Sequence, residues 1–201
     1  MALRLTVLCV LAVLIGLYLG PYRDRAQAER DALAEVATWI AGRPVSVHCP
    51  GTLERLTEVS PHDGSVAFSA EGRPADYTDL SGATCSHLAR FDERAAGDGF
   101  DCLVENARCP REIEQSAVAV NVLTHESYHL AGHQSESAVQ CYAMQRNGEA
   151  ARLLGATPEQ ADAVARFVWE HIYPALPQDY RSSDCRDGGP YDLRPASSVW
   201  P

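Results

Sequence analysis

The residues His-Glu-Ser-Tyr-His at positions 125–129 constrain the fold of this chain more than any other stretch. They have the form His-Glu-x-x-His. Side chains four residues apart lie on the same face of an α-helix, so both imidazoles can bind one metal ion. Zinc accepts neutral imidazole nitrogen, and the intervening Glu126 would lie beside the metal as a proton acceptor. The motif therefore predicts a helix that carries His125 and His129 as metal ligands.

A third protein ligand has to come from the residues that follow, because a catalytic zinc site uses three protein ligands and one open position. Glu136 lies eleven residues after His125. A continuous helix would place it about 16 Å away along the axis, so the helix must end between them. We expect the end at Gly132, since glycine adopts the left-handed conformation that terminates helices. Ser135 is then the expected N-cap of a second helix, with Glu136 in its first turn.

His133 is the alternative third ligand, because it lies four residues after His129. Three ligands stacked along one helix would spread over about 12 Å, which is too far for a single ion. Helix geometry therefore favours Glu136 over His133. One turn after Glu136, Gln140 is placed to orient a metal ligand from behind.

The segment from the motif to Glu136 resembles the zincin metallopeptidases, and in particular their gluzincin branch. In gluzincins two histidines come from one helix and a glutamate from the next. The resemblance implies that His125, His129 and Glu136 bind Zn²⁺ and that Glu126 is the general base. It covers about 25 residues, and the larger gluzincins carry the glutamate ligand further downstream, so the chain looks like a compact variant. The metzincin pattern does not fit, because its third histidine would fall on Ser135.

Length and charge limit the classes of protein to which the chain can belong. Its 201 residues suit one domain plus an N-terminal segment. Hydrophobic residues make up 46% and charged residues 22%, as in ordinary globular proteins. The formal net charge of -10 disfavours nucleic acid and anionic membrane surfaces as partners. The sequence leaves the oligomeric state undetermined.

The first 28 residues contain a membrane-targeting segment, because Leu3–Leu19 is apolar apart from Arg4 and Thr6. One interpretation is a cleaved signal peptide with a small-x-small site at residues 26–28. The other is a signal anchor, which the charged residues 23–25 favour slightly, although roughly 17 apolar residues are few for a span. In both cases the domain that starts at residue 29 lies outside the cytoplasm, either anchored to the membrane by one N-terminal helix or secreted.

Cysteine usage agrees with export. Beyond the targeting segment there is an even number of cysteines without any Cys-x-x-Cys pair, which predicts disulfides rather than zinc ligation. We expect Cys102 to pair with Cys109 across a short loop. We also expect Cys141 to pair with Cys185, which would tie the C-terminal tail to the second ligand-bearing helix. The six cysteines are Cys49, Cys85, Cys102, Cys109, Cys141 and Cys185.

The remaining patterns predict an α+β fold, with a small antiparallel sheet followed by a mainly helical, zincin-like region around the motif helix. Alternating and β-branched residues predict strands at 45–48, 53–59 and 65–69, and residues 72–79 are expected to be a loop. Helical periodicity and caps predict helices over 21–41, from Ser81 to Arg94, 110–131, 136–145 and from Pro158 to just before Pro174, with residues 92–101 as a surface loop. The metal-binding domain would span 29–176, with residues 29–43 either a helical stalk or docked on the core, and 177–201 an irregular tail.

The function expected from this reasoning is zinc-dependent hydrolysis of a peptide or protein substrate. Glu126 would take a proton from a metal-activated water and pass it to the leaving amine. Tyr128, His133 and His171 are the candidates for stabilising the oxyanion. A non-catalytic domain with a closed zinc site is the main alternative, and a disulfide-stapled interaction module with an accidental motif is another. Another divalent metal in place of zinc also stays open.

Overall fold

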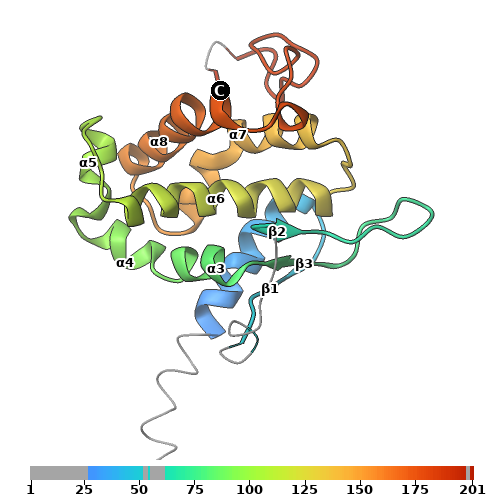
Figure 1. Cartoon of the computed structure of the whole chain (residues 1–201), viewed down its shortest axis with the longest axis horizontal. Coiled ribbons are helices and arrows are strands. Elements are labelled where there is room, and N and C mark those ends of the chain that lie inside the picture. The colour runs from blue at the N-terminus through green and yellow to red at the C-terminus, as the bar shows by residue number, and fades with distance from the viewer. Residues whose placement is uncertain (1–26, 52–53, 55–61, 198–199) are drawn as a thin grey trace, which may run out of the picture.

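The computed structural model describes residues 27–51, 54, 62–197 and 200–201, so the expected targeting segment at Leu3–Leu19 and, apart from residue 54, the strand expected at 53–59 lie outside the described residues. The described chain has an α+β fold. Helix α6 (Arg111–Leu130) crosses the middle of the molecule, with the sheet and α3 (Gly82–Leu88) on one side and α7 (Glu136–Leu153) and α8 (Pro158–Phe167) on the other (Figure 1). None of the helices in these described ranges combines the length and the hydropathy that crossing a membrane requires.

Several short elements complete the described chain. They are α4 (Phe91–Ala96), η1 (Asp98–Phe100), α5 (Asp101–Val104), η2 (Val168–Ile172), η3 (Tyr173–Ala175) and η4 (Gln178–Tyr180). The expected surface loop at 92–101 is wrong, because it includes the rest of α4, η1 and the start of α5. Burial explains this difference, since the side chains of Ala95 and Phe100 lie in the core.

The sheet contains β1 (Ser46–His48), β2 (Gly64–Ser65) and β3 (Tyr77–Leu80) in the order β1-β3-β2. β2 pairs with β3 in antiparallel fashion, but β1 pairs with β3 in parallel, so the expected antiparallel sheet is wrong for β1. The Cys49–Cys85 disulfide fits this pairing, because it joins the segments that follow β1 and β3 at the same end of the sheet. The loop expected at 72–79 is also wrong at its end, where β3 alternates exposed and buried residues.

The helix at residues 27–41 packs on the domain. Its side chains Leu33, Val36 and Ala37 are buried in the core, so this segment is docked rather than a free stalk. The helix expected over 81–94 begins as predicted, with the Ser81 hydroxyl accepting from the Thr84 backbone N–H, but it is interrupted between α3 and α4.

The six cysteines from Cys49 to Cys185 are all paired. Both pairs expected from the sequence form, Cys102–Cys109 and Cys141–Cys185, and the remaining two cysteines form Cys49–Cys85. The first bond closes the loop before α6. The second joins α7 to the C-terminal tail, which lies along α7 at the top of the molecule in Figure 1.

Helix α7 continues beyond the end that the sequence predicted. The sequence predicts a helix over 136–145 that ends at Asn147 and Gly148, since Asn and Gly are common at helix ends, but α7 runs to Leu153. Gly148 lies instead where α7 crosses α8, and a Cβ atom there would meet the Ala161 carbonyl oxygen at 3.7 Å. The next helix, α8, begins with the expected capping box, in which the Thr157 and Gln160 side chains and backbone N–H groups pair reciprocally.

Replacing Gly148 with alanine should stabilise the protein. The added methyl group would have ordinary van der Waals contacts, and alanine loses less backbone entropy than glycine inside a helix. We expect the free energy of unfolding to rise by about 0.5–1 kcal/mol in urea titrations. The Gly148→Val variant is the matched control, because its branched side chain would press on α8 and should lower stability. A destabilised Gly148→Ala variant would contradict this description of the α7–α8 crossing.

Candidate metal centre

The chain reverses direction between α6 and α7 through a helix-terminating motif at the predicted glycine. Gly132 has a φ of 101°, which favours glycine over other residues. Its N–H donates to the His129 carbonyl oxygen at 2.9 Å, and the His133 N–H donates to the Tyr128 carbonyl oxygen at 3.3 Å. This pair of bonds is the Schellman arrangement of a helix C-terminus. Ser135 then occupies the N-cap position of α7, without a side-chain capping bond.

The reversal brings the three predicted ligands together. His125 Nε2 and His129 Nε2 lie 3.0 and 3.4 Å from the same oxygen of Glu136, Oε2, and 3.1 Å from each other. Both imidazoles are buried, whereas the Glu136 side chain is 38% exposed. Among the described residues, His125, His129 and Glu136 form the group of metal-binding side chains whose ligand atoms lie close enough together, within 4.8 Å, to hold one metal ion.

The far nitrogen of each imidazole is held by a carbonyl oxygen. His125 Nδ1 donates to Gln140 Oε1 at 2.8 Å, and His129 Nδ1 donates to the His133 backbone oxygen at 2.7 Å. Because both acceptors are carbonyl oxygens, both Nδ1 atoms carry hydrogen, so in the neutral imidazoles the lone pairs lie on the two Nε2 atoms. The lone pairs are directed at one point, as metal binding requires. Gln140 therefore occupies the position behind His125 that the sequence predicts for it.

The alternative ligand His133 is not part of this cluster. Its backbone carbonyl orients His129, while its ring is exposed and packs against the rings of Tyr128 and Tyr142, at 6.0 and 5.1 Å between centroids. The other oxyanion candidates also lie elsewhere. Tyr128 packs against Tyr142, and His171 lies against Phe167, and neither of them lines the cavity beside the ligands.

Glu126 lies beside the ligand cluster in an unusual state for a carboxylate. It is only 6% exposed, and its Oε2 atom has no hydrogen-bond partner in the described part of the chain. Burial raises the pKa of this carboxyl to about 7; His125 opposes the shift and Glu136 adds to it. Burial without a partner is costly for a carboxylate. A cation held by the neighbouring ligands, together with a water, would supply the missing partner, so the residues present fit a metal.

Strand β2 closes over Glu126 at a glycine. A Cβ atom on Gly64 would lie 2.6 Å from Glu126 Cγ and 2.9 Å from Oε1, so a larger residue would displace the carboxylate. The residues of β2 and those after it, up to Phe68, form one wall of a cavity of about 400 Å³ that also contains the ligands. The sequence Pro-His-Asp-Gly at 61–64 predicts only a turn at Gly64, because the contact with Glu126 depends on the packing of the sheet against α6.

Tyr180 forms part of the same cavity and was also missed. It comes from η4 in the C-terminal tail, and its ring centroid lies 5.5 Å from that of His125. Burial raises the pKa of its hydroxyl, and the nearby Glu136 raises it further, so the phenol stays protonated and can donate. The only signal for this in the sequence was the expected Cys141–Cys185 bond, five residues after Tyr180.

Two restraints hold the tail in this position. One is the Cys141–Cys185 disulfide. The other is the buried Gln145 side chain, whose Nε2 donates to the Tyr191 carbonyl oxygen and whose Oε1 accepts from the Leu193 N–H, both at 2.8 Å. The tail is therefore a fixed wall of the site.

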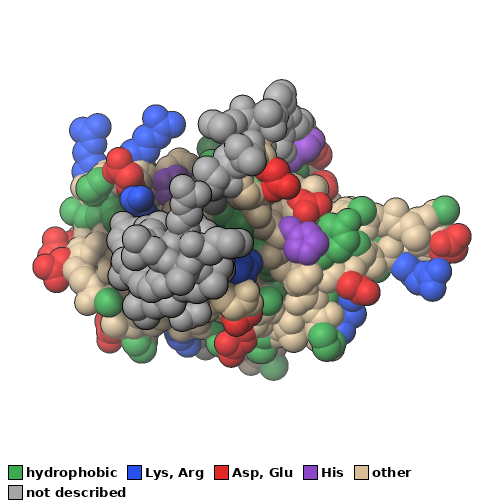
Figure 2. Space-filling view, turned by 90° about the horizontal axis from the view of Figure 1, so that it is seen from below, with side chains coloured by type: hydrophobic (Ala, Val, Ile, Leu, Met, Phe, Trp, Pro, Cys, Tyr) green, Lys and Arg blue, Asp and Glu red, His purple; other side chains and the backbone are tan. Residues whose placement is uncertain are grey.

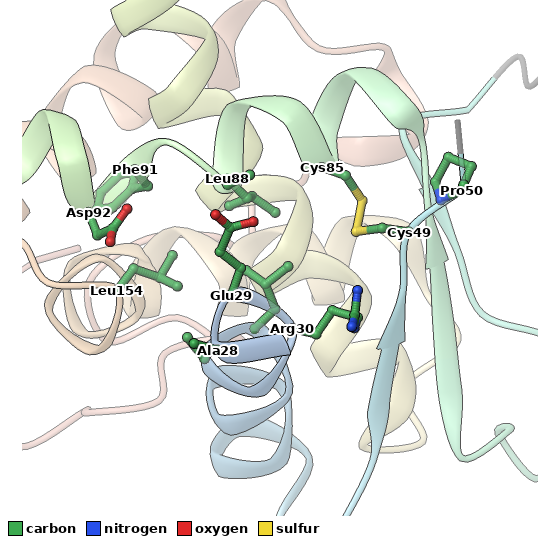
Figure 3. A pocket seen from close by; sticks show the side chains of 14 residues that line it. Ala28, Glu29, Arg30, Cys49, Pro50, Cys85, Leu88, Phe91, Asp92 and Leu154 are labelled. Atoms are coloured by element: carbon green, nitrogen blue, oxygen red, sulfur yellow. A yellow bond between two sulfur atoms is a disulfide. The ribbon is translucent and has the colours of Figure 1, made fainter. Parts of the chain in front are cut away.

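A separate cavity of about 340 Å³ lies between helix 27–41, α3 and α4 (Figure 3). Its lining is mainly apolar, with Leu33, Leu88 and Phe91 among the side chains, and it borders the Cys49–Cys85 disulfide. Among the residues that the structure describes there, we find no group of metal-binding side chains. The chemistry is therefore concentrated around the ligand cluster.

In comparisons with protein families, with curated proteins and with solved structures, no match to this chain was found. The likeness to zincins stays confined to the motif segment. Function has to be inferred from the geometry of the site.

Removing Glu136 should abolish tight metal binding. We expect the oxidised protein, purified without chelator, to contain about one zinc ion per chain, as three convergent ligands imply. Losing a residue that only hydrogen-bonds to a metal ligand typically lowers metal affinity about 10–100-fold. The zinc affinity of Glu136→Ala should fall by more than this, because a ligand itself is removed. Zinc content by mass spectrometry and competition with a chromophoric chelator would measure both. His133→Ala is the control and should keep its affinity, because only its backbone oxygen is used; the reverse result would move the third ligand to His133.

Proposed function

We propose that this protein is a zinc-dependent metallopeptidase that acts outside the cytoplasm. The observation that carries the proposal is the position of the unpartnered Glu126 oxygen in the same cavity as three convergent ligands. A structural zinc site is closed by four protein ligands. Within the described chain the cluster offers three, and it adjoins an open cavity. This arrangement favours catalysis over a closed, purely structural site.

The residues around the cluster have the properties that peptide hydrolysis needs. When bound, zinc would lower the pKa of a coordinated water and polarise the scissile carbonyl. Glu126 would accept a proton from that water as the water oxygen bonds to the carbonyl carbon, and would deliver this proton to the leaving amine as the C–N bond breaks. A pKa of about 7 suits a group that must both take and give a proton near neutral pH, although a neighbouring cation would lower it. The phenol of Tyr180 is the donor available to the carbonyl oxygen.

The edge of the sheet supports a peptide as the substrate class. In the order β1-β3-β2, strand β2 is at the edge, and the structure describes no strand beyond it. The chain from Gly64 to Phe68 borders the cavity, so an extended peptide could pair with this edge and place a carbonyl at the metal. The chain then turns back as an arm, with Ala75 N–H donating to the Ala67 carbonyl oxygen, and this arm projects from the molecule in Figures 1 and 2.

The proposed location rests on covalent chemistry and on the targeting segment. Three disulfides are stable in an oxidising compartment. The apolar stretch Leu3–Leu19 would deliver the domain there, as an anchor or as a cleaved signal. On the face shown in Figure 2, acidic and basic side chains are interspersed, which with the net charge of -10 supports a protein substrate rather than nucleic acid.

Glu126→Gln should keep zinc and lose turnover. Glutamine has nearly the same shape but cannot accept the proton, and loss of a general base typically costs about 10²–10⁴-fold in rate. Cleavage of a peptide library, followed by mass spectrometry, would give the rate, and zinc content would be measured on the same sample. Glu114→Gln, the same change in the first turn of α6, is the control and should be active. Turnover at the wild-type rate in Glu126→Gln would refute the assigned role.

Tyr180→Phe should lower kcat without lowering zinc content. Losing one hydrogen-bond donor to an oxyanion costs about 10²–10³-fold in kcat. The control is Tyr77→Phe, which removes an equivalent hydroxyl from an exposed position on β3. An effect on KM alone would show that Tyr180 only binds substrate, and an unchanged rate would leave the oxyanion to the metal.

A further inference from the structure

A chain of buried side-chain amides lies behind His125, between α6 and α7. It consists of Gln140, Asn121 and Asn147, which are 2%, 5% and 0% exposed, and none of them lines the metal cavity. We call these three residues the amide chain. Burying polar groups is unfavourable unless they are hydrogen-bonded, and apolar side chains would fill the space at lower cost. The burial of the amide chain therefore requires an explanation, and the hydrogen bond between Gln140 and His125 offers one.

The hydrogen bonds of the amide chain converge on Asn121. Gln140 Oε1 accepts from His125 Nδ1 at 2.8 Å, and Gln140 Nε2 donates to Asn121 Oδ1 at 3.1 Å. Asn147 Nδ2 donates to the same Asn121 oxygen at 3.2 Å. The Gln140 amide nitrogen also lies 3.8 Å from Met144 Sδ, a weak acceptor. Two acceptors thus face the nitrogen side of Gln140, and the oxygen side faces the imidazole.

The orientation of Gln140 decides which nitrogen of His125 can bind metal. A reversed Gln140 amide would place its oxygen against the Asn121 oxygen and the Met144 sulfur, and its NH₂ group against His125 Nδ1. Nδ1 would then have to accept, so the ring hydrogen would move to Nε2. An Nε2 atom that carries hydrogen has no lone pair for a metal. The orientation of the Gln140 amide therefore decides whether His125 is in the tautomer that can bind a metal ion or in the one that cannot.

The two histidines differ in how this choice is made. His129 Nδ1 donates to the His133 backbone oxygen, which cannot exchange places with a donor. His125 Nδ1 faces a side-chain amide, which can turn around. Only at His125 is a further residue needed to fix the acceptor. Asn121 supplies it, because its oxygen accepts N–H groups from both Gln140 and Asn147.

We infer that Asn121 is a positioning residue, which fixes Gln140 and through it the tautomer of His125 that can bind a metal ion. Its effect on metal affinity rests on the proposed zinc site. The tautomer itself is a property of the metal-free chain, so it can be measured whether or not the protein hydrolyses peptides.

The test is a two-bond ¹H–¹⁵N correlation spectrum of the full-length, metal-free protein with ¹⁵N-labelled histidine. The spectrum is recorded in a mildly alkaline buffer. His125→Gln identifies the resonances of His125. We expect the Nδ1–H tautomer at His125 in the wild type. In Asn121→Leu we expect the Nε2–H form to appear and the zinc affinity to weaken by about 10–100-fold, the usual cost of losing an outer partner.

Two further variants separate positioning from general stability. Asn121→Asp keeps an oxygen that can receive both amide N–H groups, so it should retain the wild-type tautomer and zinc affinity. Thr124→Val removes a buried hydroxyl from the same helix, which donates to the Val120 carbonyl oxygen at 2.8 Å and does not contact the amide chain. It should lower the unfolding midpoint and leave the tautomer unchanged.

The Nε2–H tautomer at His125 in the wild type would overturn the inference, even in a protein that cleaves peptides and even where Asn121→Leu does not fold. An unchanged tautomer and affinity in a folded Asn121→Leu variant would do the same. The expected tautomers in a protein that binds zinc but cleaves no peptide would support the role of Asn121 and remove the proposed activity.

Discussion

The reversal of the chain at residues 131–135 is the constraint on which the site depends. Without it, Glu136 would lie about 16 Å along the helix axis from His125. The Schellman bonds at Gly132 end α6 and turn the chain back toward it. The same motif aims the His133 carbonyl oxygen at His129 Nδ1. One local arrangement of backbone therefore delivers the third ligand and also fixes the tautomer of the second.

The site is assembled around this turn from segments that are distant in the sequence. β2 approaches Glu126 closely because residue 64 has no side chain. The tail brings Tyr180 over His125 because a disulfide and Gln145 fix it to α7. A buried carboxylate with one oxygen that has no partner among the described residues, and buried amides, are unfavourable by themselves, so the rest of the fold has to hold them in place. The core and the three covalent crosslinks provide that support.

What the sequence predicted correctly depends on local rules. Helix periodicity and rise place His125, His129 and Glu136 together once Gly132 ends the helix, and the caps at Ser81 and Thr157 follow from side-chain chemistry. The errors depend on long-range packing. No local pattern shows that β1 runs parallel to β3, that residues 92–101 are helical through buried Phe100, or that Gly148 marks a helix crossing rather than a helix end. Tyr180 was out of reach for the same reason, because its position follows from the tail's attachment.

Helix α7 joins these separate functions on one rigid element. Glu136 in its first turn is the proposed third ligand, and Gln140 one turn later contacts His125 Nδ1. Cys141 and Gln145 then hold the tail that carries Tyr180. Because all four side chains project from one helix that packs along α6, the third ligand, the orienting amide and the wall with Tyr180 keep fixed distances from one another. Any shift of α7 along α6 would therefore disturb the proposed metal site and the proposed oxyanion donor together.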